Sequence, residues 1–365
     1  MKSTRTVALV DLGIEFTGAQ SYLQNLVLLL SGEARFWLLK LSPRLTFAGQ
    51  TASTTIVDLG FAARWGRPLQ ILLCMLVLFW LRIRRGLDIV WVNGYPEIAL
   101  LPWARLLGSR AVATRHLTML TDKPNLYWLR SGWRVHFLYE RLAPIADAIV
   151  CVSETVSESL KRYVSAEKLL VIQNWVPILP EQVTLRRTNG QPLRLLFVGR
   201  LTEHKGVSIL LRAMRRFDTK NATRALSLVV VGEGEDREAL EREAAGLDVT
   251  FAGFQSDTAR YYKQTDVFIN PTLGPEGMPL VSLDAMSHGL PCILSDIPVH
   301  REITAEGKAA LLFKTGNAED LNQKITQLFE SSQLLSHCGQ MARNTVKSKH
   351  SAEFARLRYI EALGL

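Results

Sequence analysis

The sequence predicts an α/β protein of two Rossmann-like domains whose parallel sheets face each other across a cleft. The chain has 365 residues, too many for one ordinary core and suited to two domains of about 150 residues each. Short apolar runs of strand type alternate with helical stretches, the pattern of a parallel sheet covered by helices. This alternation stops at a polar, proline-interrupted segment, 177–192, and then starts again, which indicates an interdomain linker.

The first domain is predicted at 1–176. Its start holds only a four-residue apolar run before Asp11, too short for the core of a signal peptide and suited to a buried first strand. A helix is expected at Ser21–Leu30, directly after that strand. The strands expected in this domain are Thr6–Val10, Arg35–Leu41, Thr54–Leu59, Ile89–Val92, Ala111–Thr114, Ala148–Val152 and Leu169–Ile172.

The second domain is predicted at 193–345, and a final helical pattern, Ser351–Leu363, lies within a separate segment, 346–365. The expected strands are Leu193–Val198, Leu226–Val231, Val249–Ala252, Val267–Ile269, Pro291–Leu294 and Ala310–Phe313. The expected helices are Val207–Phe217, Asp236–Ala245, Ala259–Gln264, Pro279–His288 and Ala318–Glu330. The two halves thus share an architecture rather than a repeated sequence.

The net charge of +9 is concentrated in the first half of the chain. Residues 1–175 hold 20 Lys and Arg against 12 Asp and Glu, whereas residues 176–365 hold 23 against 22. A basic half attracts a phosphorylated substrate, an acidic lipid surface or nucleic acid, but no nucleic-acid-binding motif accompanies the charge. The four cysteines show no paired spacing, so neither a disulfide framework nor a zinc site is expected. We expect a reducing, cytoplasmic location instead.

Two segments of the first half combine apolar or aromatic residues with arginines. Leu69–Leu81, within 64–85, is almost uniformly apolar but about 20 Å long as a helix, short of the bilayer core. The segment fits either a buried crossover helix or a helix lying in a membrane interface. The second segment, 123–141, interleaves aromatic residues with arginines and leaves the same two alternatives open. The interfacial reading predicts a peripheral enzyme at the inner face of a membrane.

Two loops at carboxyl ends of strands are candidate anion sites. The loop after the first strand contains Gly18 and Ala19 at the start of a helix, where backbone amides can approach an anion closely, although a plain turn fits as well. The loop at 197–207 places Arg200 and Lys205 beside a second helix start, with glycines on both sides of the cations. Two fixed cations at a helix N-terminus are suited to a diphosphate.

Two acidic residues follow in a Gly/Pro-rich loop and an apolar helix. Glu276 lies in the loop, and Asp284 lies eight residues later, inside the helix. A carboxylate near a core needs partners, and the vicinal hydroxyls of a ribose would suit Asp284. An acid on a helix surface is the alternative.

These stretches resemble the family-4 glycosyltransferases, retaining enzymes of the GT-B fold. The likeness rests on FVGRLTEHKGV at 197–207, VVGEGEDREAL at 230–240, VTFAGF at 249–254 and the long motif at 265–303. In the first domain it rests more loosely on the motifs at 17–26, 87–94, 150–160 and 171–177.

The resemblance implies a donor-binding and a catalytic set of residues. Arg200 and Lys205 would bind the donor diphosphate, Glu276 the transferred sugar and Asp284 the ribose, with His116 near the reacting sugar. The remaining donor contacts implied are Gly18, Ala19, Gly199, Gly253, Phe254, Met278, Leu280 and Val281. The final segment, 346–365, would return to the first domain.

The expected activity is transfer of a hexose, with retained configuration, from a UDP- or GDP-sugar to a saccharide or lipid-linked saccharide in envelope or exopolysaccharide synthesis. No Asp-x-Asp pair occurs in the chain, so neither a metal nor another cofactor is expected. Two departures from the family pattern are Asp284 in place of Glu and Trp175 in place of Gly. A GT-B-like nucleotide-sugar epimerase and a weakly active donor-binding homologue are alternatives. A Rossmann dehydrogenase is disfavoured, because the motif at 232–237 lacks the third glycine of GxGxxG.

Overall fold

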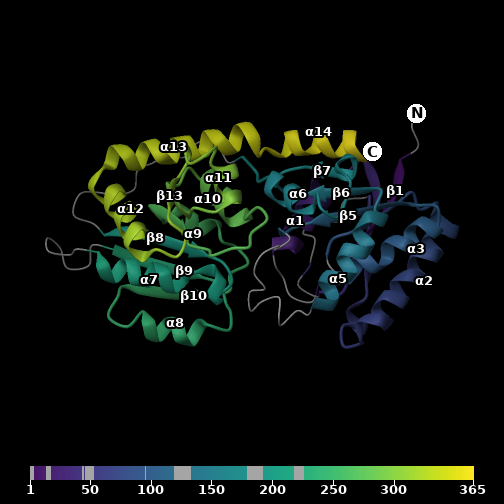
Figure 1. Ribbon diagram of the computed structural model, residues 1–365, viewed down its shortest axis with the longest axis horizontal. Helices are drawn as coiled ribbons and strands as arrows, with labels where there is room; N and C mark the ends of the chain where they lie inside the picture. Colours follow the sequence, from purple (N-terminus) through teal and green to yellow (C-terminus); the bar gives the residue numbers. More distant parts are fainter. Residues whose placement is uncertain are drawn as a thin grey trace. The chain divides into compact units, whose positions relative to one another are not determined.

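The computed structural model describes residues 4–13, 18–42, 45, 53–94, 96–118, 133–178, 192–217 and 226–365, and divides the chain into two compact units (Figure 1). Unit 1 is Met1–Asn174 with Glu353–Leu365, and unit 2 is Trp175–Ala352. The C-terminal segment that packs with unit 1 therefore starts at Glu353, and residues 346–349 instead close a helix of unit 2. Of the expected linker, 179–191 lies outside the described residues.

Unit 1 is a parallel seven-stranded sheet in the order β3-β2-β1-β4-β5-β6-β7. Its strands are β1 (Arg5–Asp11), β2 (Ala34–Lys40), β3 (Thr54–Asp58), β4 (Ile89–Val92), β5 (Arg110–Arg115), β6 (Ala148–Cys151) and β7 (Leu169–Val171). Its helices are α1 (Gly18–Leu29), α2 (Arg67–Arg85), α3 (Leu101–Leu106), α5 (Trp133–Leu142), α6 (Glu154–Leu160) and α14 (Ala352–Leu363). Short 3-10 turns lie at η1 (Gly60–Ala62), η2 (Pro96–Leu100), η3 (Ala143–Ile145) and η4 (Ala166–Lys168).

Unit 2 is a parallel six-stranded sheet in the order β10-β9-β8-β11-β12-β13. Its strands are β8 (Leu193–Val198), β9 (Leu226–Val231), β10 (Val249–Gly253), β11 (Val267–Asn270), β12 (Cys292–Ser295) and β13 (Leu311–Phe313). Its helices are α7 (Val207–Arg216), α8 (Arg237–Glu243), α9 (Ala259–Lys263), α10 (Leu280–Ser287), α11 (Pro298–Ile303), α12 (Ala318–Glu330) and α13 (Ser332–Lys349), with a 3-10 turn η5 (Glu203–Lys205).

The two parallel Rossmann-like sheets confirm the predicted fold class. Central strands such as β4 and β11 are buried along their whole length, as expected for strands covered by helices on both faces. Four helices were not predicted from the sequence, namely α3, α6, α11 and α13. Three of these have six or seven residues, too few for a helical period to stand out from the flanking apolar runs.

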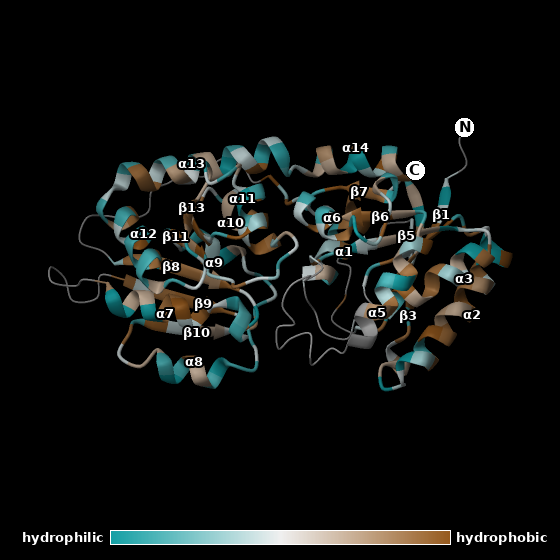
Figure 2. Cartoon of the chain, viewed as in Figure 1, coloured by the Kyte–Doolittle hydropathy of each residue, from teal (hydrophilic) through white to brown (hydrophobic). Residues whose placement is uncertain are grey.

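Helix α2 contains the apolar run Leu69–Leu81 and buries only one of its faces. Gln70, Cys74, Leu78 and Leu81 are buried, whereas the opposite face is exposed. The helix begins after Gly66 and ends at Gly86, whose φ of 67° is left-handed. In Figure 2 most of its ribbon is coloured hydrophobic. One face of the helix is thus part of the core, and the opposite face is an exposed apolar surface.

Helix α14 packs on unit 1 through polar contacts with α1 and β5. The hydroxyl groups of Tyr359 and Tyr22 are 2.7 Å apart and buried. Arg110 donates to the carbonyl oxygen of Leu363 over 3.1 Å. Among the described helices, none is both long and apolar enough to span a bilayer.

Candidate functional site

Lys205 and Glu276, from two different loops of unit 2, are in direct contact. Lys205 closes the turn η5, and its ammonium group donates a hydrogen bond to Oε1 of Glu276. The side chains are 23% and 8% exposed, so the ion pair is largely shielded from water. The cation and the carboxylate assigned to the donor from the sequence thus lie side by side.

A glycine and two further hydrogen bonds bring these two loops together. Gly206 has a φ of 72°, and a Cβ atom there would lie 2.1 Å from the carbonyl oxygen of Pro271, so only glycine allows this approach. The carbonyl oxygen of His204 accepts from the amide of Leu273 (2.7 Å) and from Oγ1 of Thr272 (3.1 Å). Gly206 also precedes α7, so Lys205 lies at the start of a ten-residue helix.

The surroundings of Glu276 keep its carboxylate ionised. Burial alone would raise the pKa of Glu276, but the charge and hydrogen bond of Lys205 outweigh it and hold the pKa below its ordinary value. Burial lowers the pKa of His300, a fully buried neighbour, to about 4. His300 is therefore neutral near pH 7, and Lys205 carries the positive charge that faces Glu276.

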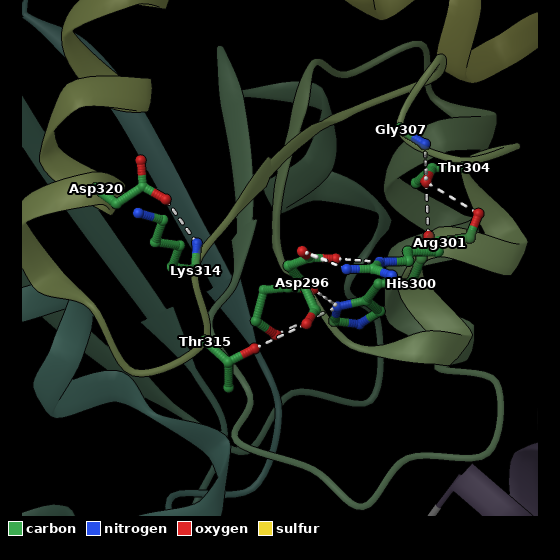
Figure 3. A network of polar contacts seen from close by, with 9 residues as sticks. Asp296, His300, Arg301, Thr304, Gly307, Lys314, Thr315 and Asp320 are labelled. Atoms are coloured by element: carbon green, nitrogen blue, oxygen red, sulfur yellow. Dashed lines mark hydrogen bonds and ion pairs between the residues drawn. The ribbon is translucent and has the colours of Figure 1, made fainter.

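His300 belongs to a polar network that joins the end of β12 to α11 (Figure 3). The Nδ1 atom of His300 donates to the carbonyl oxygen of Ser295 over 2.8 Å. Its Nε2 atom is 3.5 Å from the side-chain nitrogen Nδ2 of Asn270 on β11. Beside it, the carboxylate of Asp296 accepts two bonds from Arg301, 2.5 and 2.7 Å long. The network holds His300 at the end of β12, where this residue acts electrostatically on Glu276.

Asp284 lies on α10 and is partly buried. Burial raises the pKa of Asp284 to about 7. Among the residues that the structure describes, none donates a hydrogen bond to this carboxyl group. His288 and Tyr262 instead hold the helix itself, through the carbonyl oxygens of Asp284 (2.8 Å) and Val281 (3.2 Å). The carboxyl group therefore keeps its acceptor capacity for a ligand with hydroxyl groups.

The start of α10 presents backbone amides of residues assigned to the donor. Pro279 precedes the helix, and no side chain caps it. The first amides of a helix have no partner within it, so those of Leu280 and Val281 can face an anion. Met278 is buried just before them.

The glycines after β8, β9 and β10 allow close backbone contact. A Cβ atom on Gly232 would lie 1.8 Å from the carbonyl oxygen of Gly199, and one on Gly234 would lie 2.1 Å from that of Leu201. These glycines therefore serve loop packing, as expected where no GxGxxG fingerprint is present. Gly253 has a φ of 71°, and Phe254 after it is about half exposed.

Arg200 lies two residues after the end of β8, and its charge acts on His204, as that of Lys205 does. Burial comes first among the causes that lower the pKa of His204, followed by the charges of Lys205 and Arg200. Two cations, Arg200 and Lys205, thus act on His204 at this strand end, and the carboxylate of Glu276 acts on the same histidine. Such a cluster can hold a group with more than one negative charge.

In unit 1, a chain of hydrogen bonds joins the carboxyl ends of β1, β4 and β5. Nε2 of His116 lies 2.9 Å from Oδ1 of Asn93. The side-chain nitrogen Nδ2 of Asn93 donates to the carboxylate of Asp11 (2.7 Å) and to the carbonyl oxygen of Ala19 (3.2 Å). The rings of Tyr22 and His116 are in T-shaped contact, with 4.8 Å between centroids. Gly18 starts α1 and is exposed.

Glu97 is a buried carboxyl group beside this chain. Its Oε1 atom accepts a hydrogen bond from the amide of Leu12 over 2.6 Å, and no described group pairs with Oε2. Burial, with the charge of Asp11, raises the pKa of Glu97 to about 7. Sequence analysis missed Asn93, Glu97 and His300, because a single polar residue after an apolar strand carries no distinguishing pattern.

Two family models match successive parts of the chain. The model "Glycosyltransferase Family 4" matches residues 18–178, and "Glycosyl transferases group 1" matches residues 192–331. Each match falls on one of the two sheets, so together they cover the candidate residues of both units.

Curated relatives match shorter stretches. The lipopolysaccharide core biosynthesis glycosyltransferase LpsE of Rhizobium meliloti is 24% identical over 60% of this chain and 64% of its own length. A phosphatidyl-myo-inositol mannosyltransferase of Mycobacterium leprae is 32% identical over 38% of each chain. In both cases the chain matches less than two thirds of the relative's length.

Solved structures share the fold along the whole chain. HepE of Anabaena in complex with UDP and glucose has a TM-score of 0.78 at 16% identity, covering 99% of each chain. Sucrose-phosphate synthase from Thermosynechococcus elongatus has a TM-score of 0.81 at 16% identity, covering 98% of each. Together with the two family models and the two parallel sheets, this likeness shows that the chain belongs to the family-4 glycosyltransferases with the GT-B fold.

Proposed function

We propose that the protein is a retaining glycosyltransferase that moves a hexose from a UDP- or GDP-sugar to a saccharide or lipid-linked saccharide in envelope or exopolysaccharide synthesis. The observation that carries this proposal is the buried contact between Lys205 and Glu276 at the start of α7. UDP is present in the HepE complex, and two relatives have names from lipopolysaccharide and phosphatidylinositol mannoside synthesis. These names support the donor and acceptor classes.

The leaving group of this reaction is a nucleoside diphosphate, which gains negative charge as the sugar–phosphate bond breaks. Preorganised cations and amide dipoles stabilise such charge and commonly supply the largest catalytic contribution. Lys205 and Arg200, with the first amides of α7 and α10, form such a set in unit 2. We assign the diphosphate to these groups and expect no metal ion to be required.

In this mechanism Glu276 orients the sugar instead of attacking it. Its carboxylate is ionised but already bonded by Lys205, which lowers its nucleophilicity. Lys205 would contact the diphosphate while it stays beside Glu276, so the carboxylate remains ionised and its other oxygen can accept sugar hydroxyl groups. Retention then follows from attack on the face that the diphosphate leaves, with a phosphate oxygen taking the acceptor proton.

A donor screen tests the proposal. We expect one class among UDP-, GDP- and ADP-sugars to raise the melting temperature by about 2–4 °C at a hundredfold excess over Kd. With an acceptor saccharide, product analysis should show transfer with retained configuration and no effect of a chelator. If no nucleotide sugar stabilises the protein, the proposal fails. Release of epimerised donor in the absence of acceptor would favour the epimerase. Donor binding without turnover would favour the weakly active donor-binding homologue.

We propose further that the enzyme works at the inner face of a membrane and docks on it through the outer face of α2. Six large apolar side chains on this face are 46–65% exposed. They follow helical spacing and form one stripe, which comprises Leu69, Leu72, Leu76, Phe79, Trp80 and Ile83. Phe61 and Trp65, in edge-to-face contact and both exposed, continue it before the helix.

Charge at both ends of the stripe favours an anionic lipid surface over a protein partner. Arg64 precedes the helix, and Arg82, Arg84 and Arg85 occupy its last turn, all exposed. Completing the burial of six half-exposed apolar side chains contributes roughly 1 kcal/mol each. An arginine near an anionic surface adds about 1 kcal/mol. The sum is sufficient for reversible docking. The other candidate segment, 123–141, lies mostly outside the described residues.

Vesicle flotation distinguishes the contribution of the apolar stripe from that of the arginines. Leu72→Ser with Leu76→Ser should reduce binding to both phosphatidylcholine and phosphatidylglycerol vesicles by about tenfold. Arg84→Ser with Arg85→Ser should reduce binding only to the anionic vesicles, and salt should have the same effect. The matched control, Phe354→Ser with Leu357→Ser, removes two equally exposed apolar residues from α14. Equal binding by all variants would rule out docking through α2.

A further inference from the structure

The hydroxyl group of Thr272 lies between the two loops that carry Lys205 and Glu276. Thr272 is fully buried, two residues after the end of β11. Its Oγ1 atom is 3.1 Å from the carbonyl oxygen of His204, the residue before Lys205. The same atom is 3.2 Å from the amide nitrogen of Gly274, two residues before Glu276. One side chain thus bonds to the backbone beside each member of the ion pair.

The chemistry of the two partners fixes the direction of both bonds. A carbonyl oxygen can only accept, so Thr272 gives its single hydroxyl hydrogen to His204. A backbone amide can only donate, so Oγ1 accepts from Gly274. Because a β-branched side chain has few allowed χ1 values, this hydroxyl group holds the two backbone segments at one separation.

A further hydrogen bond, from β12, anchors the backbone of Thr272. The Oγ atom of Ser295, a fully buried residue at the end of β12, donates to the carbonyl oxygen of Thr272 over 2.6 Å. Thr272 is therefore tied to the turn η5, to its own loop and to the neighbouring strand. A buried polar network whose members are all bonded makes a structure rigid.

We propose that Thr272 is a positioning residue that holds Lys205 and Glu276 at the separation the donor requires, through the backbone of the residues beside them. This inference rests on the proposed function for the identity of the ligand that the ion pair meets. Thr272 is fully buried, so its role is exerted on backbone groups and not on the donor itself.

The two loops would still meet without this hydroxyl group. The amide of Leu273 also donates to the carbonyl oxygen of His204, over 2.7 Å, and Gly206 packs closely against Pro271. The hydroxyl group of Thr272 therefore contributes the accuracy of the placement. Accuracy matters here, because a misplacement of about 1 Å can lower the rate of an enzyme about 100-fold.

Two substitutions separate the hydroxyl group from the shape of the side chain. Thr272→Val keeps the branched shape without the hydroxyl group and should lower kcat about tenfold at saturating donor and acceptor. The KM for the donor should change less than kcat, because the pair acts mainly as charge develops on the leaving group. Thr272→Ser restores the hydroxyl group and should keep kcat within about threefold of the wild type.

The placement can also be measured without any substrate. Burial raises the pKa of Glu276, but Lys205, with His300 and His204, holds it below its ordinary value. In Thr272→Val the lysine can move away, so this pKa should rise. Carboxyl ¹³C signals of the full-length protein labelled with ¹³C-glutamate, followed over a pH series, report it, and Glu276→Gln assigns the signal. The acid limb of kcat should move to higher pH in the same variant.

Thr304→Val is the matched control. Thr304 is fully buried at the end of α11, and its hydroxyl group also donates to a carbonyl oxygen, that of His300 (2.6 Å), and accepts from an amide, that of Gly307 (3.0 Å; Figure 3). These bonds join only α11 and the turn after it. The control variant should lower the melting temperature without changing kcat or the titration of Glu276.

An unchanged kcat and an unchanged titration of Glu276 in Thr272→Val would overturn the inference. A serine variant as impaired as the valine variant would overturn it too, because the methyl group would then be the important part. If Thr272→Val does not fold, Ser295→Ala removes the bond from β12 and should change both measurements in the same direction, and an unchanged titration there would be equally decisive. Failure of the donor screen would refute the proposed function and leave the titration measurable, so the two failures are separable.

Discussion

Lys205→Ala should abolish glycosyl transfer, lowering kcat by about 10³-fold or more, because the variant removes the cation closest to the departing diphosphate. The contact with Glu276 makes the effect larger than the loss of one charge. Without Lys205, burial raises the pKa of Glu276, and a protonated acid accepts sugar hydroxyl groups poorly. Steady-state transfer and donor affinity, measured separately, check the result.

The control must break a comparable ion pair away from the site. Lys40 in unit 1 pairs with Asp58 over 2.8 Å and is 6% exposed. Lys40→Ala should therefore cost stability, like Lys205→Ala, but leave kcat unchanged. Lys205→Arg keeps the charge and should retain part of the activity. Turnover of Lys205→Ala within about threefold of the wild type would refute the assignment of the diphosphate to this residue.

Donor affinity should fall about tenfold per pH unit below about pH 7, because the pKa of Asp284 is about 7 in the empty protein. Two ribose hydroxyl groups would donate to the ionised carboxylate and lower this pKa in the complex. Binding therefore releases a proton at acid pH and is strongest once Asp284 is ionised. Calorimetry or fluorescence titration with the donor over a pH series measures this dependence.

Asp284→Asn should remove this pH dependence, weaken donor binding and yet raise stability. The carboxyl of Asp284 has an ordinary pKa of 3.8 and a higher pKa when folded, so folding favours the protonated form. That contribution is fully present below pH 3.8 and is lost as pH rises to about 7. At pH 8 the asparagine variant should therefore be more stable by roughly 2 kcal/mol. Equal stability and affinity in the two proteins would contradict a ligand-binding role for Asp284.

Local patterns were sufficient to predict the strands of both sheets. Buried parallel strands such as β4 and β8 are short apolar runs between helical stretches, and this signal comes from burial on both faces. Local patterns also predicted the ligand-binding loops at strand ends, because charged residues beside glycine indicate a ligand site. Lys205 and Glu276 were identified in this way, and the structure brings them into contact.

The sequence left open which face of α2 is covered. Its apolar run fitted both a core helix and an interfacial helix, because hydropathy does not distinguish a buried side from an exposed one. Packing against the sheet buries only the stripe that includes Cys74 and Leu78. The second stripe, with Leu72 and Leu76, stays exposed, and this supplies the proposed docking face.

The sequence by itself determined two Rossmann-like domains and a set of cations and acids suited to a nucleotide sugar, because periodicity and strand-end chemistry are local properties. Only the tertiary structure decided the partners of those groups. Asp11, Asn93 and His116 are tens of residues apart in the chain and meet because β1, β4 and β5 are neighbours in the sheet. Burial then sets the pKa values of Asp284 and His116, which depend on the surrounding packing and not on the residue type alone.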